Sequence, residues 1–183
     1  LRDQVSLKLL ELGIGVRSNQ ILLTQGATQG LDLIARTLLK PGDCVLVDDP
    51  GYWNLFANLR LVGVNLVGVP RTSHGPDAEV LEQLLEEHHP KIFFTQSVLH
   101  NPTSCNITPA NAFRLLQLAE KHDLLIVEDD VYGDLHPGPA TRLAQLDQLR
   151  RVIYVGSFSK TLSANLRVGF VACAPDLAVD LTD

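Results

Sequence analysis

The sequence contains no methionine and only three cysteines. Cys44, Cys105 and Cys173 lie far apart in the 183 residues. An odd, scattered set argues against a disulfide framework and against a zinc site, and it is typical of a reducing compartment. We therefore expect a cytoplasmic protein in which each cysteine is a small buried hydrophobic residue rather than a reactive thiol.

Long apolar runs and an excess of positive charge are also absent. No run approaches the roughly 18 residues that a membrane helix needs, and the N-terminal "LRDQVSLKLLELGIG" contains acids, unlike a signal peptide. The 15 lysines and arginines against 21 aspartates and glutamates give a formal net charge of −6. An acidic domain is a poor non-specific binder of nucleic acid. These absences argue against a membrane partner and against DNA binding by this segment itself.

The residues that are present describe one globular domain. Hydrophobic residues make up 45% of the chain and charged residues 20%, which is ordinary for a folded domain with a sizeable core. There is no initiator methionine, and the final "DLAVDLTD" looks like the start of a helix. We interpret residues 1–183 as a single domain that is cut from a longer protein at both ends.

Strand-like and helix-like segments alternate along the chain. Short apolar runs predict strands at 20–24, 44–49, 65–71, 91–96, 124–129, 151–157 and 168–174. Helical spacing and helix-start residues predict helices at 26–40, 52–63, 77–89 and 108–122, and 136–142 reads as a surface loop. The strands are near-continuous apolar runs, which indicates burial on both faces, as in a parallel sheet covered by helices. The predicted fold class is therefore α/β.

Polar residues and glycines lie at the ends of these apolar runs. In open α/β sheets, ligands bind beyond the carboxyl ends of the strands. We therefore take the following residues as candidates for a ligand site: Gly26, Ala27, Thr28, Tyr52, Asn101, Asp129, Tyr132, Ser157, Lys160 and Arg167. Taken singly each is weak evidence, since a strand-end lysine is usually solvated and an Asn-Pro dipeptide is often only a turn.

Taken together, the candidates match the parts of one ligand. Lys160 could form a Schiff base with an aldehyde, if its amine is desolvated and partly deprotonated. Arg167, Ser157 and the turn at 26–28 could hold a phosphate at a helix N-terminus. Asp129 could pair with a protonated ring nitrogen.

The remaining candidates suit an aromatic ring. Tyr132 and Asn101 could hydrogen-bond a ring hydroxyl, and Tyr52 could stack on a ring face. An aldehyde, a phosphate, a pyridine nitrogen and a ring hydroxyl are the parts of pyridoxal 5'-phosphate. In that cofactor a protonated ring acts as an electron sink. The sequence therefore predicts a site for pyridoxal 5'-phosphate.

The motifs resemble those of a known family. "HNPTS" is similar to the Asn-Pro-Thr-Gly motif of the class I and II aminotransferases, "DDVY" to their Asp-x-x-Tyr motif, and "SFSK" followed by "LRVG" to their lysine and phosphate-arginine signature. The motifs also occur in the family's order, and the resemblance covers essentially the whole chain. It implies the large domain of fold-type I pyridoxal-phosphate enzymes, a three-layer αβα structure with a mostly parallel, seven-stranded sheet.

The resemblance also implies a role for each candidate. Lys160 would carry the cofactor as a Schiff base and would shuttle a proton if catalysis occurs. Asp129 would pair with the pyridine nitrogen. Tyr132 and Asn101 would contact the ring hydroxyl, while Tyr52 would stack on the ring. The residues implied to hold the phosphate are Ala27, Thr28, Ser157 and Arg167, with Gly26 allowing close backbone approach.

A finer resemblance is to the MocR branch of the GntR transcription regulators, in which an aminotransferase-like domain follows a winged helix-turn-helix. "EDDVYGDL", "SFSKTLSANLRVGF" and "DDPGYWNLFANLRLVGV" look more like that branch than like ordinary aspartate or alanine aminotransferases. This implies a homodimer that binds DNA only through an upstream domain and senses an amino acid or other amino compound. The alternative is a metabolic aminotransferase acting on amino acids and 2-oxo acids, because the cofactor-holding residues would be the same.

Further expectations concern departures from the family pattern and other motifs. Ser104 stands where the family motif usually has glycine, which affects the local turn geometry but not the role of Asn101. The small domain with its substrate-binding arginine would lie beyond Asp183, so we expect no transamination from this segment alone. Ser157-x-x-Lys160 also matches the serine–lysine motif of penicillin-binding proteins, but their Ser-Asp-Asn and Lys-Thr-Gly motifs are absent. The histidines show no metal-binding spacing, and Trp53 is expected to pack rather than to take part in chemistry.

Overall fold

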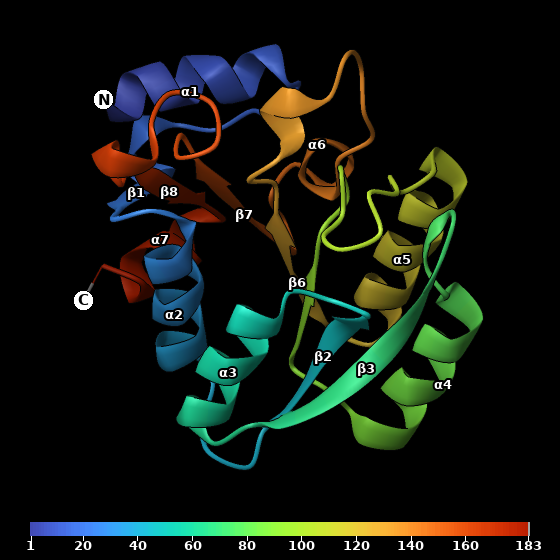
Figure 1. Cartoon of the computed structure of the whole chain (residues 1–183). Coiled ribbons are helices and arrows are strands. Elements are labelled where there is room, and N and C mark those ends of the chain that lie inside the picture. The colour runs from blue at the N-terminus through green and yellow to red at the C-terminus, as the bar shows by residue number, and fades with distance from the viewer. Residues whose placement is uncertain (183) are drawn as a thin grey trace.

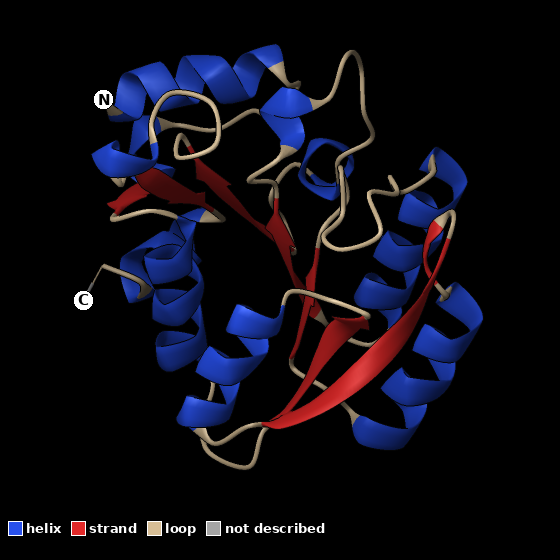
Figure 2. Cartoon of the chain, viewed as in Figure 1, coloured by secondary structure: helices blue, strands red, loops and turns tan. Residues whose placement is uncertain are grey.

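The computed structural model describes residues 1–182, so Asp183, the last residue of the expected domain, lies outside the described residues. One central sheet has helices on both sides (Figures 1 and 2). The strands are β1 (Ile21–Thr24), β2 (Cys44–Asp49), β3 (Asn65–Thr72), β4 (Gly75–Pro76), β5 (Ile92–Thr95), β6 (Leu125–Asp129), β7 (Val152–Ser157) and β8 (Gly169–Ala172). The helices are α1 (Arg2–Glu11), α2 (Ala27–Leu38), α3 (Trp53–Val62), α4 (Ala78–His88), α5 (Pro109–Lys121), α6 (Leu143–Asp147) and α7 (Pro175–Asp180). Short 3₁₀ helices occupy Ser18–Gln20, Gly133–Leu135 and Ala164–Leu166.

The strand order in the sheet is β1-β8-β7-β6-β5-β2-β3-β4. Strands β2, β3, β5, β6 and β7 pair in parallel, whereas β8 pairs antiparallel with both β1 and β7. The predicted three-layer α/β fold with a mostly parallel sheet is therefore confirmed. The apolar runs predicted seven strands, and all seven are present. The eighth, β4, is a two-residue antiparallel partner of β3 that leaves no apolar run in the sequence.

A hydrophobic core lies on each face of the sheet. Helices α1, α4, α5 and α6 contribute to one core, and α2, α3 and α7 contribute to the other. Phe93 and Phe94 are neighbours in β5, yet Phe93 belongs to the first core and Phe94 to the second. Successive side chains of a strand point to opposite faces. A strand with both faces covered must be apolar throughout, which explains the continuous runs.

Two helices begin where capping chemistry predicts. Asp77 accepts hydrogen bonds from the backbone N–H groups of Glu79 and Val80 at the start of α4. Thr108 caps α5 by accepting a hydrogen bond from Asn111 N, with Pro109 in the first turn. These side chains satisfy N–H groups that a helix start leaves without partners. Among residues 1–182, no helix combines the length and the apolar composition needed to cross a membrane.

Two expectations about exposure are wrong. Trp53 is 71% exposed rather than packed, because it lies two residues before Leu55, about 200° around α3 from the buried face. The segment 136–142 is irregular, as predicted, but its last residue, Arg142, is buried. The reason is an ion pair in the interior, in which Arg142 Nε lies 2.7 Å from Asp130 Oδ2.

The cysteines are only partly as expected. Cys173 is buried, whereas Cys44 and Cys105 are partly exposed. Cys44 is the first residue of β2, and Cys105 lies in the loop before α5. Neither position is covered by a core on both sides.

The ends of several strands meet at one edge of the sheet. Because β8 is antiparallel to both of its neighbours, β1 runs parallel to β7. Thr24, at the end of β1, and Ser157, at the end of β7, both pair with Gly169 at the start of β8. The start of α2 therefore reaches the same edge as the segments that follow β5, β6 and β7. Ligands of α/β sheets bind at this edge.

Candidate cofactor site

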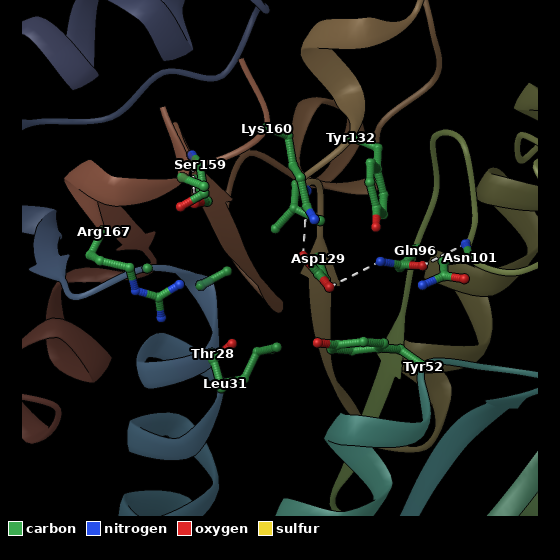
Figure 3. A pocket seen from close by; sticks show the side chains of 15 residues that line it. Thr28, Leu31, Tyr52, Gln96, Asn101, Asp129, Tyr132, Ser159, Lys160 and Arg167 are labelled. Atoms are coloured by element: carbon green, nitrogen blue, oxygen red, sulfur yellow. Dashed lines mark hydrogen bonds between the residues drawn. The ribbon is translucent and has the colours of Figure 1, made fainter. Parts of the chain in front are cut away.

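A cavity of about 200 Å³ opens at this edge (Figure 3). All ten residues proposed from the sequence line it: Gly26, Ala27, Thr28, Tyr52, Asn101, Asp129, Tyr132, Ser157, Lys160 and Arg167. The sequence analysis missed five other lining residues, namely Leu31, Gln96, Val131, Ser159 and Ala164. A search for polar residues at strand ends could have identified two of these, since Gln96 directly follows β5 and Ser159 lies inside "SFSK".

One end of the cavity is built for an anion. Helix α2 begins after Gly26, whose φ of +80° suits glycine, and no side chain of residues 1–182 caps its first N–H groups. Arg167 lies beside this helix start, with its Nη2 donating to Gln25 O at 3.4 Å. A Cβ at position 26 would approach Arg167 Nη2 to 3.3 Å. Free N–H groups, the helix dipole and a guanidinium all favour a negative group here.

Two serines complete this end. Ser157 Oγ donates to Val168 O at 3.3 Å and accepts from Ser159 N at 3.2 Å. The Ser159 hydroxyl is buried, and no hydrogen-bond partner for it occurs in the part of the chain that the structure describes. Buried hydroxyl groups normally have a partner. A hydroxyl without one at the cavity wall is ready to bond a ligand.

Asp129 occupies the middle of the cavity at the end of β6 (Figure 3). It is only 6% exposed. Burial raises the pKa of Asp129 to about 7, while a hydrogen bond from Gln96 and the charge of Lys160 oppose the rise. Gln96 Nε2 donates to Asp129 Oδ2 at 3.0 Å. A buried carboxylate without a direct ion-pair partner favours a cationic group opposite it.

Lys160 faces Asp129 and Tyr132 across the cavity (Figure 3). Its Nζ lies 5.4 Å from the centre of the Tyr132 ring. The Lys160 side chain is exposed to solvent, whereas the sequence analysis expected its amine to be desolvated. The reason is its position in the loop after β7, on the open side of the cavity.

The far end of the cavity carries the aromatic and amide groups. Tyr52 precedes α3, and Asn54 Nδ2 donates to its hydroxyl at 3.1 Å. Asn101 is held by its backbone N–H, which donates to Gln96 Oε1 at 2.8 Å. Ser104, in the place of the family glycine, has φ of +59°. The turn thus keeps the left-handed conformation that glycine adopts most easily.

Buried polar contacts fix the segment after β6, which carries Tyr132. Asp130 accepts hydrogen bonds from Arg142 Nε at 2.7 Å and from the Tyr154 hydroxyl at 2.6 Å. Glu128 accepts two backbone hydrogen bonds, each of 2.8 Å, at the start of α6. Burial and the nearby Asp130 raise the pKa of Glu128 to about 7. These carboxylates hold the backbone on either side of Asp129.

Residues 8–182 match the family model described as aminotransferase class I and II. The chain belongs to this family. Ser157 ends a buried strand in this fold rather than beginning a helix, so the serine–lysine alternative does not fit. The family match and the fold agree over nearly the whole chain.

Curated relatives of two kinds are similar to the chain. It is 40% identical over 170 residues to the 2-aminoadipate transaminase of Thermus thermophilus, covering 89% of this chain and 42% of that protein. It is 33% identical over 168 residues to the "Probable rhizopine catabolism regulatory protein MocR" of Rhizobium meliloti, covering 91% of this chain and 33% of that protein. The chain thus spans less than half the length of each.

A solved structure agrees with the fold in detail. The chain superposes on the α-aminoadipate aminotransferase LysN of Thermus thermophilus with a TM-score of 0.91 and 33% identity. The match covers 98% of this chain and 46% of that one, and LysN is complexed there with N-(5'-phosphopyridoxyl)-L-leucine.

Proposed function

We propose that this chain is the cofactor-binding domain of a pyridoxal-phosphate protein and that its strand-end cavity holds pyridoxal 5'-phosphate. The observation that carries the proposal is the arrangement of one cavity. An uncapped helix start with Arg167 lies at one end, and the buried Asp129 faces Lys160 in the middle. The phosphopyridoxyl compound in LysN, a relative with the same fold, supports it.

The residues present fit this group. At the anion end, the orphaned Ser159 hydroxyl, Ser157, Arg167 and the N–H groups of Ala27 and Thr28 would hold the phosphate, with Gly26 leaving room for it. At the other end, Asn101 and Tyr132 would bond the ring hydroxyl and Tyr52 would cover the ring. Lys160 would form the covalent link to the aldehyde carbon through Nζ. When bound, the cofactor supplies an electron sink for reactions of amino compounds.

Two side chains would carry the protons. Asp129, as a carboxylate, would hold a proton on the ring nitrogen opposite it, because the ion pair offsets the cost of burying its charge. Lys160, once its Nζ is free, would take up and return a proton on the open side of the cavity. The Tyr132 ring, whose centre lies 5.4 Å from Lys160 Nζ, would limit where that amine can move.

We further infer that the domain is the sensor of a GntR/MocR-type regulator, with an amino acid or other amino compound as its effector. The similarity to MocR and the motifs quoted above support this inference. A homodimer that binds DNA through another domain would then be the working form. The 40% identity to a transaminase favours a second candidate, a metabolic aminotransferase. The coding sequence upstream distinguishes them, since a winged helix with a basic recognition helix supports the regulator and its absence supports the enzyme.

The test is a titration of the full-length protein with pyridoxal 5'-phosphate, followed by visible absorbance. We expect saturable absorbance of the lysine-linked cofactor in the wild type and in a Lys40→Ala control, which changes an exposed lysine before β2. Lys160→Ala should lose it. Equal absorbance in all three proteins, or none in the wild type, would overturn the proposal.

A further inference from the structure

Gln96 joins two of the groups that face the ring. It directly follows β5 and is only 6% exposed. Its Nε2 donates to Asp129 Oδ2 at 3.0 Å, and its Oε1 accepts from Asn101 N at 2.8 Å (Figure 3). One buried side chain therefore contacts both the carboxylate proposed to face the ring nitrogen and the residue proposed to bond the ring hydroxyl.

Buried polar groups hold Gln96 from below. Its backbone N–H donates to Asp48 Oδ2 at 3.1 Å, and the neighbouring Thr95 hydroxyl donates to the same carboxylate. Asp48 is paired with Arg71, whose Nη1 lies 2.9 Å from Asp48 Oδ2, and both side chains are almost wholly buried. A chain of contacts thus runs from β3 through β2 and β5 to Asp129. These buried contacts restrict the movement of the groups around Gln96, while Arg71 Nε and Nη2 have no hydrogen-bond partner among the described residues.

The partners of Gln96 fix the orientation of its amide. An amide has one accepting oxygen and one donating nitrogen, whereas a backbone N–H can only donate. Since Asn101 N–H occupies the oxygen, the nitrogen must face Asp129. A donor in that place favours an ionised carboxylate as its acceptor. Gln96 therefore offers Asp129 a donor that cannot turn away without losing both bonds.

We propose that Gln96 is a positioning residue that holds the Asp129 carboxylate toward the ring nitrogen of pyridoxal 5'-phosphate and links it to Asn101. This inference rests on the proposed function. Gln96 itself touches neither the covalent link nor the phosphate; it acts through Asp129. Removing its amide leaves a buried carboxylate with one donor fewer. The free energy lost is larger than the net contribution of the hydrogen bond itself.

Some charges near Asp129 raise its pKa and others lower it. Asp130, directly after β6, raises the pKa of Asp129, and Lys160, after β7, lowers it. Asp48, Arg71 and His100 lie behind Gln96 on the β2, β3 and β5 side. Because none of these groups changes in a Gln96 variant, a change in the titration of Asp129 reports on the amide alone.

The experiment compares two probes on the full-length protein. They are pyridoxal 5'-phosphate and its deaza analogue, in which carbon replaces the ring nitrogen. Gln96→Leu removes both hydrogen bonds, and Gln96→Met removes them with a side chain of nearly the length of glutamine and no new charge. Gln117→Leu makes the same chemical change on the exposed face of α5 as a control.

We expect Gln96→Leu and Gln96→Met to weaken binding of pyridoxal 5'-phosphate by about tenfold or more, as for loss of a hydrogen bond to a charged group. Binding of the deaza analogue should change much less, because that ring has no N–H group to donate to Asp129. In the cofactor-free protein, infrared titration of the Asp129 carboxyl should move to higher pH in both variants. The control should match the wild type in all three measurements.

The outcomes separate this inference from the proposed function. If the wild type forms no Lys160-dependent link with pyridoxal 5'-phosphate, the proposed function fails. If the wild type forms it and both Gln96 variants keep the wild-type ratio of the two affinities, the positioning role is wrong. A variant that weakens both probes equally also overturns it, since that result indicates a general loss of structure. Should Gln96→Leu fail to fold, Gln96→Met, whose side chain has nearly the length of glutamine, still decides between these outcomes.

Discussion

Gly169 lies directly against Gly26. A Cβ at position 169 would come within 2.5 Å of the Gly26 carbonyl carbon and within 2.8 Å of Ala27 N. No side chain can occupy that space, and the atoms in the way are backbone atoms that cannot rotate aside. The contact brings the start of α2 against the start of β8, which fixes the distance between the free N–H groups of α2 and Arg167.

The first prediction follows from this contact. Gly169→Ala should push the α2 start away, destabilise the protein by about 1–3 kcal/mol through overpacking, and weaken phosphate binding. Urea unfolding and titration with pyridoxal 5'-phosphate measure the two effects. Gly15→Ala is the control, because its added carbon would meet only the flexible Gln148 side chain, at 3.2 Å. Wild-type stability and affinity in Gly169→Ala would contradict the close packing described above.

The second prediction concerns Arg167 and the phosphate. Arg167→Lys keeps the charge but loses the fork of donors, so affinity for pyridoxal 5'-phosphate should fall by about tenfold. Affinity for pyridoxal, which has no phosphate, should stay nearly constant. Arg60→Lys, on the exposed side of α3, serves as the control. Equal losses for both ligands would show that Arg167 does not bind the phosphate.

The third prediction concerns pH and the cofactor-free protein. Burial raises the pKa of Asp129 to about 7 in the folded chain, so the folded state holds this proton more tightly than the unfolded state. The contribution of Asp129 to stability therefore falls as the pH rises from about 4 through about 7. Asp129→Asn removes this loss and should be more stable than the wild type near pH 8, by up to about 4 kcal/mol.

Urea unfolding of the cofactor-free wild type and variant, near pH 5 and near pH 8, measures this difference. Burial and Asp130, which the substitution leaves in place, raise the pKa of Glu128, so we expect its contribution to cancel in the comparison. Glu120→Gln, at an exposed site on α5, should follow the wild type. Parallel pH dependences in the wild type and Asp129→Asn would refute the prediction.

The fourth prediction contrasts a buried ion pair with an exposed one. Arg142→Ala leaves the buried Asp130 carboxylate without its cation, which should cost about 3–5 kcal/mol in unfolding free energy. Arg151→Ala breaks a pair with Asp123, a residue whose side chain is 93% exposed, and should cost less than about 1 kcal/mol. Thermal or urea unfolding of both variants checks the contrast. Similar losses would mean that Asp130 finds another partner when Arg142 is removed.

Much of the site was predictable because its chemistry lies at strand ends. Apolar runs locate the strands, and residues such as Asp129 and Lys160 follow them in the sequence. Once the strands are parallel, their carboxyl ends meet, so ten scattered residues converge on one cavity. Period, order and residue type indicate the shared edge of the sheet, while the role expected of each residue also came from the resemblance to the aminotransferases.

Other parts of the site depend on contacts that no local pattern records. Gln96 gains its place through bonds to residues on other segments, and Arg142 is buried only because Asp130 lies beside it. The packing of Gly169 against Gly26 joins positions 143 residues apart. Lys160 looked like a buried amine from its motif, yet its loop leaves it exposed. These features follow from three-dimensional neighbours rather than from sequence neighbours.

The antiparallel strand β8 has a consequence for how the chain folds. Among residues 1–182, the early strand β1 pairs with β8 alone, whose residues lie about 150 positions later, as in the pair Ile21 and Ala172. Pairing at such separation is slow, because the entropy of closing a long loop is lost before the strand contacts form and stabilise it. During synthesis β1 has no strand to join until β8 has emerged. The anion end of the cavity, which needs α2 and Arg167 together, is therefore completed only after the other strands of the sheet have been made.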